Sequence, residues 1–263
     1  MSTTIAILNS KGGVGKTTLA VTLAAGFAGA GKKVALVDTD PQGNVAKWFG
    51  MAEESGMYDL LIKERHVAEV LRLVPTAQWW PGETGGVLAI LPGNARTTTA
   101  GVALAVDRAP ASKLREALEP LRDSVDVVIL DTAPTVTELM ANIFLAADWA
   151  IIPTETRVLS VNGVIKTMDR IEAVQDQISL AVLGIQPTRH AARQIECQEN
   201  LKTLNDLFDG KVWPVFGERS PWTEAPSFGK SIFAYAPRQH KAVREAAQFV
   251  KMAWDALSAK AVW

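Results

Sequence analysis

The sequence predicts a doubly wound α/β fold, in which helices cover both faces of a mostly parallel β-sheet. Short apolar runs rich in β-branched residues recur along the chain, and stretches with helical spacing separate them. These runs do not alternate strictly with polar residues, which is typical of parallel strands that are buried on both faces. In addition, a glycine-rich loop follows the first predicted strand and opens the first predicted helix.

The elements follow from these patterns in chain order. Strands are predicted over residues 5–9, 34–38, 87–91, 125–131, 149–154, 180–186 and 212–216. Helices are predicted over residues 16–30, 112–122, 137–147, 161–174, 192–208 and 239–257. In the first helix, Leu19, Leu23 and Phe27 recur every four residues, and Gly31 stands where a helix C-cap is expected. Residues 75–86 contain the dipeptides Pro81-Gly82 and Gly85-Gly86 and are interpreted as an irregular surface loop.

Length and composition indicate one domain over residues 1–263. The chain has 263 residues, and 48% of them are hydrophobic, which is enough to bury a large core. Its single cysteine, Cys197, excludes an intrachain disulfide and a cysteine-based metal cluster within one chain. The N-terminus shows no signal-peptide pattern, and no apolar run is long enough to span a bilayer, so we expect a cytoplasmic protein.

Charge is distributed unevenly, although the formal net charge is only −1. Residues 186–263 hold 11 Lys and Arg against 8 Asp and Glu, and the remainder of the chain is net acidic. An anionic partner is therefore expected to bind the C-terminal third.

Residues 11–18 have the composition of a phosphate-binding loop. They read K-G-G-V-G-K-T-T and lie between a predicted strand and a predicted helix. Glycines allow the backbone to approach phosphates closely, and the helix N-terminus points N–H groups at negative charge. Lys16 is expected to bridge the β- and γ-phosphates, Thr17 to bind Mg²⁺ and Thr18 to contact the α-phosphate. The alternative, a glycine-rich turn with two solvated lysines, does not explain the strand–helix context.

This loop departs from the strict pattern G-x-x-x-x-G-K-[ST], because Ser10 takes the place of the first glycine and Lys11 is an additional lysine. In these respects it resembles the deviant Walker A motif of the ParA/MinD family of ATPases. The resemblance implies a P-loop NTPase that uses ATP and Mg²⁺. It also implies that Lys11 reaches the nucleotide of a partner subunit. The cofactor-binding residues are then Lys11, Gly12, Gly13, Val14, Gly15, Lys16, Thr17 and Thr18.

Carboxylates follow two of the predicted strands. Residues 38–44 read D-T-D-P-Q-G-N and residues 131–134 read D-T-A-P. Ligands of doubly wound sheets bind beyond the carboxyl ends of strands, where such residues are well placed. Asp131 is expected to hold Mg²⁺, and by resemblance Asp40 orients the hydrolytic water while Asp38 supports the loop lysine or the metal shell. The alternatives are that Asp38 caps the following turn and that Asp40 is a helix N-cap before Pro41. The catalytic residues that the resemblance implies are Lys11, Lys16 and Asp40.

The resemblance extends along most of the chain. Residues 224–230 read E-A-P-S-F-G-K and residues 235–237 read Y-A-P, which is similar to a block that distinguishes ParA-like from MinD-like members. The first predicted strand begins at Ile5, so we expect the short ParA-like class without a preceding DNA-binding domain. Thr188 is similar to a residue near the adenine, but residues 189–193, which read R-H-A-A-R, depart from the family pattern.

The family's activity implies an ATP-dependent homodimer that hydrolyses ATP slowly and positions cargo such as a plasmid, a chromosome or a protein complex. A ParB-like or other cargo adaptor protein would stimulate hydrolysis. Non-specific DNA would bind clustered basic side chains, and the protein would be associated with the nucleoid. The candidate DNA-binding residues are Arg193, Arg219, Lys230, Arg238, Lys241 and Arg244. The alternative is that these side chains form an ordinary solvated surface.

Other functions remain as alternatives. A MinD-like ATPase that cycles on membranes is disfavoured, because the predicted C-terminal helix has few basic residues beside its apolar face. A relative of the nitrogenase iron protein would need two cysteines from each subunit, and a tyrosine autokinase would need a tyrosine-rich tail. A switch that binds ATP without hydrolysing it is also consistent with the motifs.

Overall fold

The computed structural model describes residues 2–52, 55–106, 110–134, 139–176 and 178–260. These residues form a seven-stranded sheet in the order β3-β4-β2-β5-β1-β6-β7. The strands are β1 (Thr3–Ile7), β2 (Lys33–Asp38), β3 (Arg72–Leu73), β4 (Val87–Leu91), β5 (Val127–Asp131), β6 (Trp149–Glu155) and β7 (Ala181–Thr188). In this sheet β3 runs antiparallel to β4, and the other neighbours are parallel. The predicted doubly wound α/β fold is confirmed.

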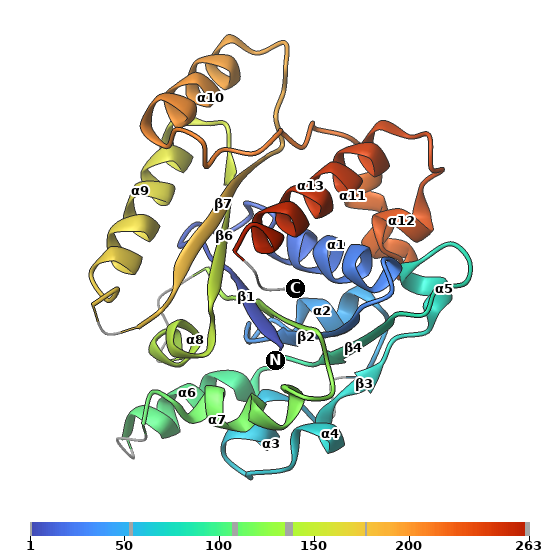
Figure 1. Cartoon of the computed structure of the whole chain (residues 1–263), viewed down its shortest axis with the longest axis vertical. Helices are drawn as coiled ribbons and strands as arrows, with labels where there is room; N and C mark the ends of the chain where they lie inside the picture. The colour runs from blue at the N-terminus through green and yellow to red at the C-terminus, as the bar shows by residue number, and fades with distance from the viewer. Residues whose placement is uncertain (1, 53–54, 107–109, 135–138, 177, 261–263) are drawn as a thin grey trace.

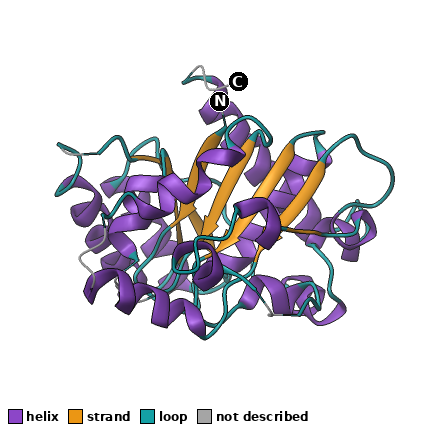
Figure 2. Ribbon diagram, turned by 90° about the horizontal axis from the view of Figure 1, so that it is seen from below, coloured by secondary structure: helices purple, strands orange, loops and turns teal. Residues whose placement is uncertain are grey.

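Helices cover both faces of the sheet, because successive side chains of a strand point to opposite faces. Ile5 and Ile7 belong to one core cluster, and Ala6 and Leu8 belong to the other. The first cluster is covered by α1 (Lys16–Gly29), α2 (Asn44–Trp48), α5 (Thr76–Trp79), α12 (Ile232–Tyr235) and α13 (Lys241–Ser258). The second is covered by α3 (Met57–Leu61), α4 (Val67–Val70), α6 (Arg96–Val106), α7 (Lys113–Leu118), α8 (Met140–Ala146), α9 (Val158–Glu172) and α10 (Ile195–Leu207). Figures 1 and 2 show the sheet between these two layers.

Helix α1 is buried almost all round, because it lies between the sheet and α13. Its apolar residues Leu19, Leu23 and Phe27 are fully buried, as their spacing predicted. On the side toward α13, Gly26 allows a close approach: a β-carbon at this position would lie 2.3 Å from a methyl group of Val250. This contact fixes how closely α13 packs on the helix that carries the phosphate loop.

The prediction of a strand over residues 212–216 is wrong. This segment follows β7 through isolated bridges, with hydrogen bonds that include Trp213 N to Ile185 O at 2.8 Å. It does not form a continuous ladder, and Pro214 within it has no N–H to donate. The short edge strand β3 was not predicted, since two residues give no periodic pattern.

Several helical predictions need correction. Residues 75–86 are not simply a surface loop, because they contain α5 and because Trp79 is fully buried in the core. The helix predicted over residues 112–122 is divided into α7 and the 3₁₀ helix η1 (Glu119–Leu121), where Pro120 removes a backbone donor. The predicted start of the helix over residues 137–147 lies outside the described residues, and α8 accounts for its remainder. Helix α6 was missed, as were α2, α3, α4, α12 and α11 (Pro221–Glu224), with the 3₁₀ helix η2 (Ala225–Phe228) after it.

The apolar stripe of α13 faces the core. Val243, Phe249 and Leu257 are buried against α1 and β7, whereas Ala247 is exposed. His240 begins this helix, because its Nδ1 accepts a hydrogen bond from the N–H of Ala242 at 3.1 Å. None of the helices in the described residues is long and apolar enough to cross a membrane.

The Gly26–Val250 contact leads to a stability prediction. We expect Gly26→Ala to lower the free energy of unfolding by roughly 1–3 kcal/mol, because overpacking outweighs the gain in helix propensity of about 1 kcal/mol. Chemical denaturation without nucleotide would measure it. Gly85→Ala is the control, since a β-carbon there meets nothing within 4 Å. Adding Val250→Ala should recover part of the loss; equal stabilities of Gly26→Ala and the control would contradict this account.

Candidate functional site

The candidate site lies where β1, β2 and β5 end. Register places Asp131 beside both Ile7 and Asp38. Two threonines tie these strand ends together: Thr39 Oγ1 donates to the carbonyl of Asp131 at 2.8 Å, and Thr132 Oγ1 donates to the carbonyl of Ile7 at 2.7 Å. The acidic residues are therefore held against the loop that follows β1.

That loop is anchored by a residue that the sequence did not single out, Asn9. Its Nδ2 donates to the carbonyl of Pro153 at 2.7 Å, and its Oδ1 accepts from the N–H of Lys11 at 2.8 Å. Gly13 and Gly15 have φ values of 78° and 90°, which a residue with a β-carbon adopts only with strain. The signal for Asn9 was present in the sequence, because a polar side chain at the end of a buried strand needs a partner.

Lys16 lies across this loop. Its side chain is buried, and its Nζ donates to the carbonyls of Asn9 at 3.1 Å and Lys11 at 3.0 Å. Burial lowers the pKa of Lys16, while the nearby carboxylates of Asp131 and Asp40 act in the opposite direction. The predicted phosphate-contacting lysine and the two predicted acidic residues are thus close together.

Asp131 is fully buried, and neither of its carboxylate oxygens has a hydrogen-bond partner among the residues that the structure describes. Burial raises the pKa of Asp131 to about 7. The Thr17 hydroxyl lies near enough to lower this pKa in part, although it is not in ordinary hydrogen-bond geometry, and Asp40 raises it further. Unpaired carboxylate oxygens beside a hydroxyl are suitable ligands for Mg²⁺, which commonly takes one or two carboxylates together with phosphates and waters.

No group of three or more His, Cys, Asp or Glu side chains in the described part of the chain is arranged to hold a metal. A cation at Asp131 and Thr17 would therefore complete its shell with oxygens from a phosphate ligand or from water. The residues present fit a Mg²⁺–nucleotide complex better than a metal site built from protein alone.

Asp38 does not offer free oxygens in the same way. Its Oδ1 accepts from the N–H of Asp40 at 2.9 Å, and its Oδ2 accepts from the N–H of Val45 at 3.0 Å. Burial, with a contribution from Asp131, raises the pKa of Asp38 well above its usual value. These contacts match the capping alternative, so we leave Asp38 out of the proposed metal ligands. Asp40 is also buried and uses Oδ1 to accept from the N–H of Gln42 at 2.9 Å.

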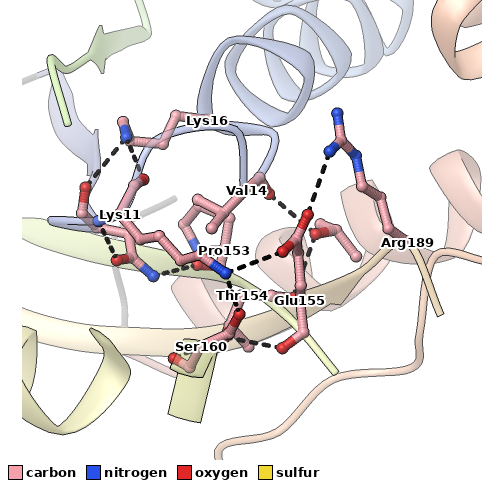
Figure 3. A network of polar contacts seen from close by, with 10 residues as sticks. Lys11, Val14, Lys16, Pro153, Thr154, Glu155, Ser160 and Arg189 are labelled. Atoms are coloured by element: carbon pink, nitrogen blue, oxygen red, sulfur yellow. Dashed lines mark hydrogen bonds and ion pairs between the residues drawn. The ribbon is translucent and has the colours of Figure 1, made fainter. Parts of the chain in front are cut away.

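Lys11 points away from the loop and toward the end of β6 (Figure 3). Its Nζ donates to Ser160 Oγ at 2.7 Å and pairs with Glu155 Oε2 at 3.1 Å. The other oxygen of Glu155 pairs with Arg189 Nη1 at 3.1 Å. The two lysines of the loop are therefore in different places, and the contacts of Lys11 within its own subunit were not predicted.

A cavity of about 390 Å³ adjoins the loop and the start of α1. Thr18, Glu155 and Arg189 line it together with residues 216–219, 222 and 223. Thr188 also lines it, but the Thr188 hydroxyl donates to the carbonyls of Val14 at 2.9 Å and Thr154 at 3.2 Å. This hydroxyl supports the phosphate loop.

The candidate DNA-binding residues are not equivalent. Arg193, Lys230, Arg238, Lys241 and Arg244 are exposed. Arg219 is half-buried, and its guanidinium bonds both oxygens of Glu245, with the shortest contact 2.8 Å. Since this pairing engages the charge of Arg219, we leave it out of the proposed DNA surface.

The chain is similar in sequence to known proteins. The model of a family described as an AAA domain matches residues 2–183. The chromosome-partitioning ATPase Soj of Thermus thermophilus is 34% identical over 241 residues, which cover 89% of this chain and 88% of Soj.

Solved structures confirm the fold. Apo McdA of Cyanothece has a TM-score of 0.82 at 20% identity and covers 98% of this chain and 100% of its own. The septum site-determining protein MinD of Pyrococcus horikoshii, solved with Mg-ADP, has a TM-score of 0.74 at 21% identity and covers 97% of this chain and 96% of its own. The family-model match and the identity to Soj agree with the two-lysine phosphate loop and with the buried Asp131 beside it. The chain therefore belongs to the ParA/MinD family of deviant Walker A ATPases.

Proposed function

We propose that this chain hydrolyses ATP and forms an ATP-dependent homodimer in which Lys11 contacts the nucleotide of the partner subunit. The observation that carries the proposal is the separation of the two lysines. Lys16 is buried across its own loop, whereas the Lys11 side chain lies beside the loop and is 34% exposed. A second subunit can therefore reach the Lys11 ammonium without rearrangement of the loop.

The loop over residues 12–18, which includes Lys16 and Thr18, binds the phosphates through N–H groups and side chains. Thr17 and Asp131 would hold Mg²⁺, which would supply positive charge to offset that of the phosphates. Asp40 lies close enough to Asp131 and Lys16 to influence both groups, and it orients the attacking water. The cavity beside Thr188 takes the base and the ribose.

We further propose that the dimer binds non-specific DNA and partitions or positions cargo together with a ParB-like or other adaptor protein. Binding to the phosphate backbone of DNA requires clustered Lys and Arg side chains but no motif that reads bases. A two-fold dimer doubles such a cluster. The name of the Soj relative, a chromosome-partitioning ATPase, supports this role. The expected location is the cytoplasm at the nucleoid, and the cargo would be a plasmid, a chromosome or a protein complex.

One observation favours DNA over the MinD-like membrane cycle. The apolar stripe of α13 is packed against α1 and β7, so this helix does not present it to a lipid surface. The exposed side of α13 near its N-terminus instead carries two basic side chains, those of Lys241 and Arg244. Such side chains suit a phosphate backbone, whereas binding in the plane of a membrane would also need a free apolar face.

The dimer proposal is tested by Lys11→Ala. We expect this variant to bind ATP but to dimerise at least about tenfold more weakly, because the partner's nucleotide loses a buried counter-charge. Analytical ultracentrifugation with a non-hydrolysable ATP analogue at saturating concentration would measure the dimer. Lys202→Ala, which removes an exposed lysine on α10, is the matched control. Parent-like dimerisation of Lys11→Ala would refute the proposed role of Lys11.

The metal proposal is tested by Asp131→Asn. A buried carboxylate without a partner is costly, so we expect the ligand-free variant to be more stable than the parent at pH 8 by roughly 1–3 kcal/mol. The raised pKa gives the sign: the folded state loses stability as the pH rises toward 7, where Asp131 ionises, and the amide variant avoids this loss.

The same variant should lose the thermal stabilisation that Mg²⁺ and ATP give the parent, and thermal melts with and without the ligands would measure both effects. Asp123→Asn, at an exposed aspartate, is the control. An Asp131→Asn variant that is destabilised without ligand, or that keeps the full Mg²⁺–ATP shift, would contradict the assignment.

The DNA proposal is tested by the double variant Lys241→Glu/Arg244→Glu. With ATP, we expect weaker binding to arbitrary duplex DNA and a plot of log K against log salt that is shallower by about 2, since each lost phosphate contact removes about one unit of slope. Lys166→Glu/Lys202→Glu makes the same charge change on α9 and α10 and serves as the control. Salt-insensitive binding, or binding to anionic vesicles in place of DNA, would count against the proposal.

A further inference from the structure

We propose that Glu155 and Arg189 are positioning residues for Lys11. Glu155 stores the Lys11 ammonium within its own subunit, and Arg189 lowers the cost of releasing it by remaining as the counter-ion of Glu155. This inference rests on the proposed function, because it concerns the lysine that would reach the partner's nucleotide.

The carboxylate of Glu155 is shared between two cations that come from different sides. Oε2 pairs with Lys11 Nζ and Oε1 pairs with Arg189 Nη1, each at 3.1 Å, and the Glu155 side chain is only 12% exposed. Figure 3 shows the carboxylate between the two side chains. Parallel register between β6 and β7 aligns Glu155 with Thr188, so Arg189 leaves the sheet directly beside Glu155.

The backbone holds Arg189 in this place. Its φ is 48°, a left-handed conformation that is uncommon for a residue with a β-carbon and that persists only where the surroundings impose it. The next residue is fixed on both sides: His190 N donates to the carbonyl of Phe216 at 2.9 Å, and the His190 carbonyl accepts from Glu218 N at 3.2 Å. The direction of Arg189 is thus set by the fold as well as by its ion pair.

The electrostatic consequence concerns the departure of Lys11. If Lys11 were the sole cation beside Glu155, its departure would leave a largely buried carboxylate without a counter-charge, which is unfavourable. Arg189 stays in contact with the other oxygen and compensates that charge. The other hydrogen bond of Lys11 goes to the neutral hydroxyl of Ser160, which holds an ammonium group less strongly than a carboxylate does.

The two residues therefore have opposite predicted effects on the ATP-dependent dimer. Glu155→Gln should free Lys11 from its own subunit and strengthen the dimer. Arg189→Ala should strengthen the Lys11–Glu155 ion pair and thereby weaken the dimer. We expect shifts of about two- to five-fold in the dimer dissociation constant, the size typical of a partly exposed ion pair. Arg189→Lys should behave like the parent, and the double variant should follow Glu155→Gln, because Arg189 acts through Glu155.

The experiment is analytical ultracentrifugation of the full chain with a saturating non-hydrolysable ATP analogue and Mg²⁺. Nucleotide affinity of each variant is measured separately by titration, because Glu155 and Arg189 both line the cavity. Arg122→Ala, which breaks the distant pair between Arg122 and Glu119, is the control. Opposite shifts for Glu155→Gln and Arg189→Ala would support the inference.

Two results would overturn it: shifts of both variants in the same direction, or shifts no larger than that of the control. Failure of the proposed function gives a different pattern, because Lys11→Ala would then dimerise like the parent. If Lys11→Ala loses the dimer while Glu155→Gln and Arg189→Ala leave it unchanged, the function stands and only the positioning role is lost.

Discussion

The site depends on the burial of one unpaired carboxylate, that of Asp131, among other charged groups. Asp131 is the last residue of the central strand β5 and lies beside Asp38 and Asp40, with the Lys16 cation close by. Register and the two threonine bonds at the strand ends keep these groups together, so the chain cannot relieve the repulsion by moving them apart. The arrangement sacrifices stability in the isolated chain for a place where a cation and phosphates are favoured.

The backbone of the loop and the ammonium group of Lys11 are held by different residues. Asn9 and Thr188 fix the backbone of the loop to the ends of β6 and β7, through the carbonyls of Pro153 and Val14. The ammonium group of Lys11 is held by the side chains of Glu155 and Ser160. A change in the position of this group therefore requires side-chain rotation, while the backbone that surrounds the phosphates keeps its shape.

Sequence patterns predicted the parts of this structure that repeat or that follow a motif. The parallel sheet and helix α1 were predicted from hydrophobic periodicity, and the phosphate loop was predicted from the spacing of its glycines. Sequence patterns did not predict contacts between distant segments. Nothing near Glu155 in the sequence shows that it contacts Arg189. Arg219 was predicted to bind DNA because its partner Glu245 is 26 residues away and could not be recognised from the local sequence. Asp38 was ambiguous for a different reason: its partners, the N–H groups of Asp40 and Val45, are close in sequence, but only hydrogen-bond geometry separates a cap from a metal ligand.

The sheet edges have a consequence for how two copies can associate. At one edge β3 offers only two residues, and at the other the segment over residues 212–217 bridges β7. Among the residues that the structure describes, neither edge presents a long row of open backbone donors and acceptors that a second chain could extend. Edge-to-edge joining into a continuous intermolecular sheet is thereby discouraged, which protects against fibrous aggregation.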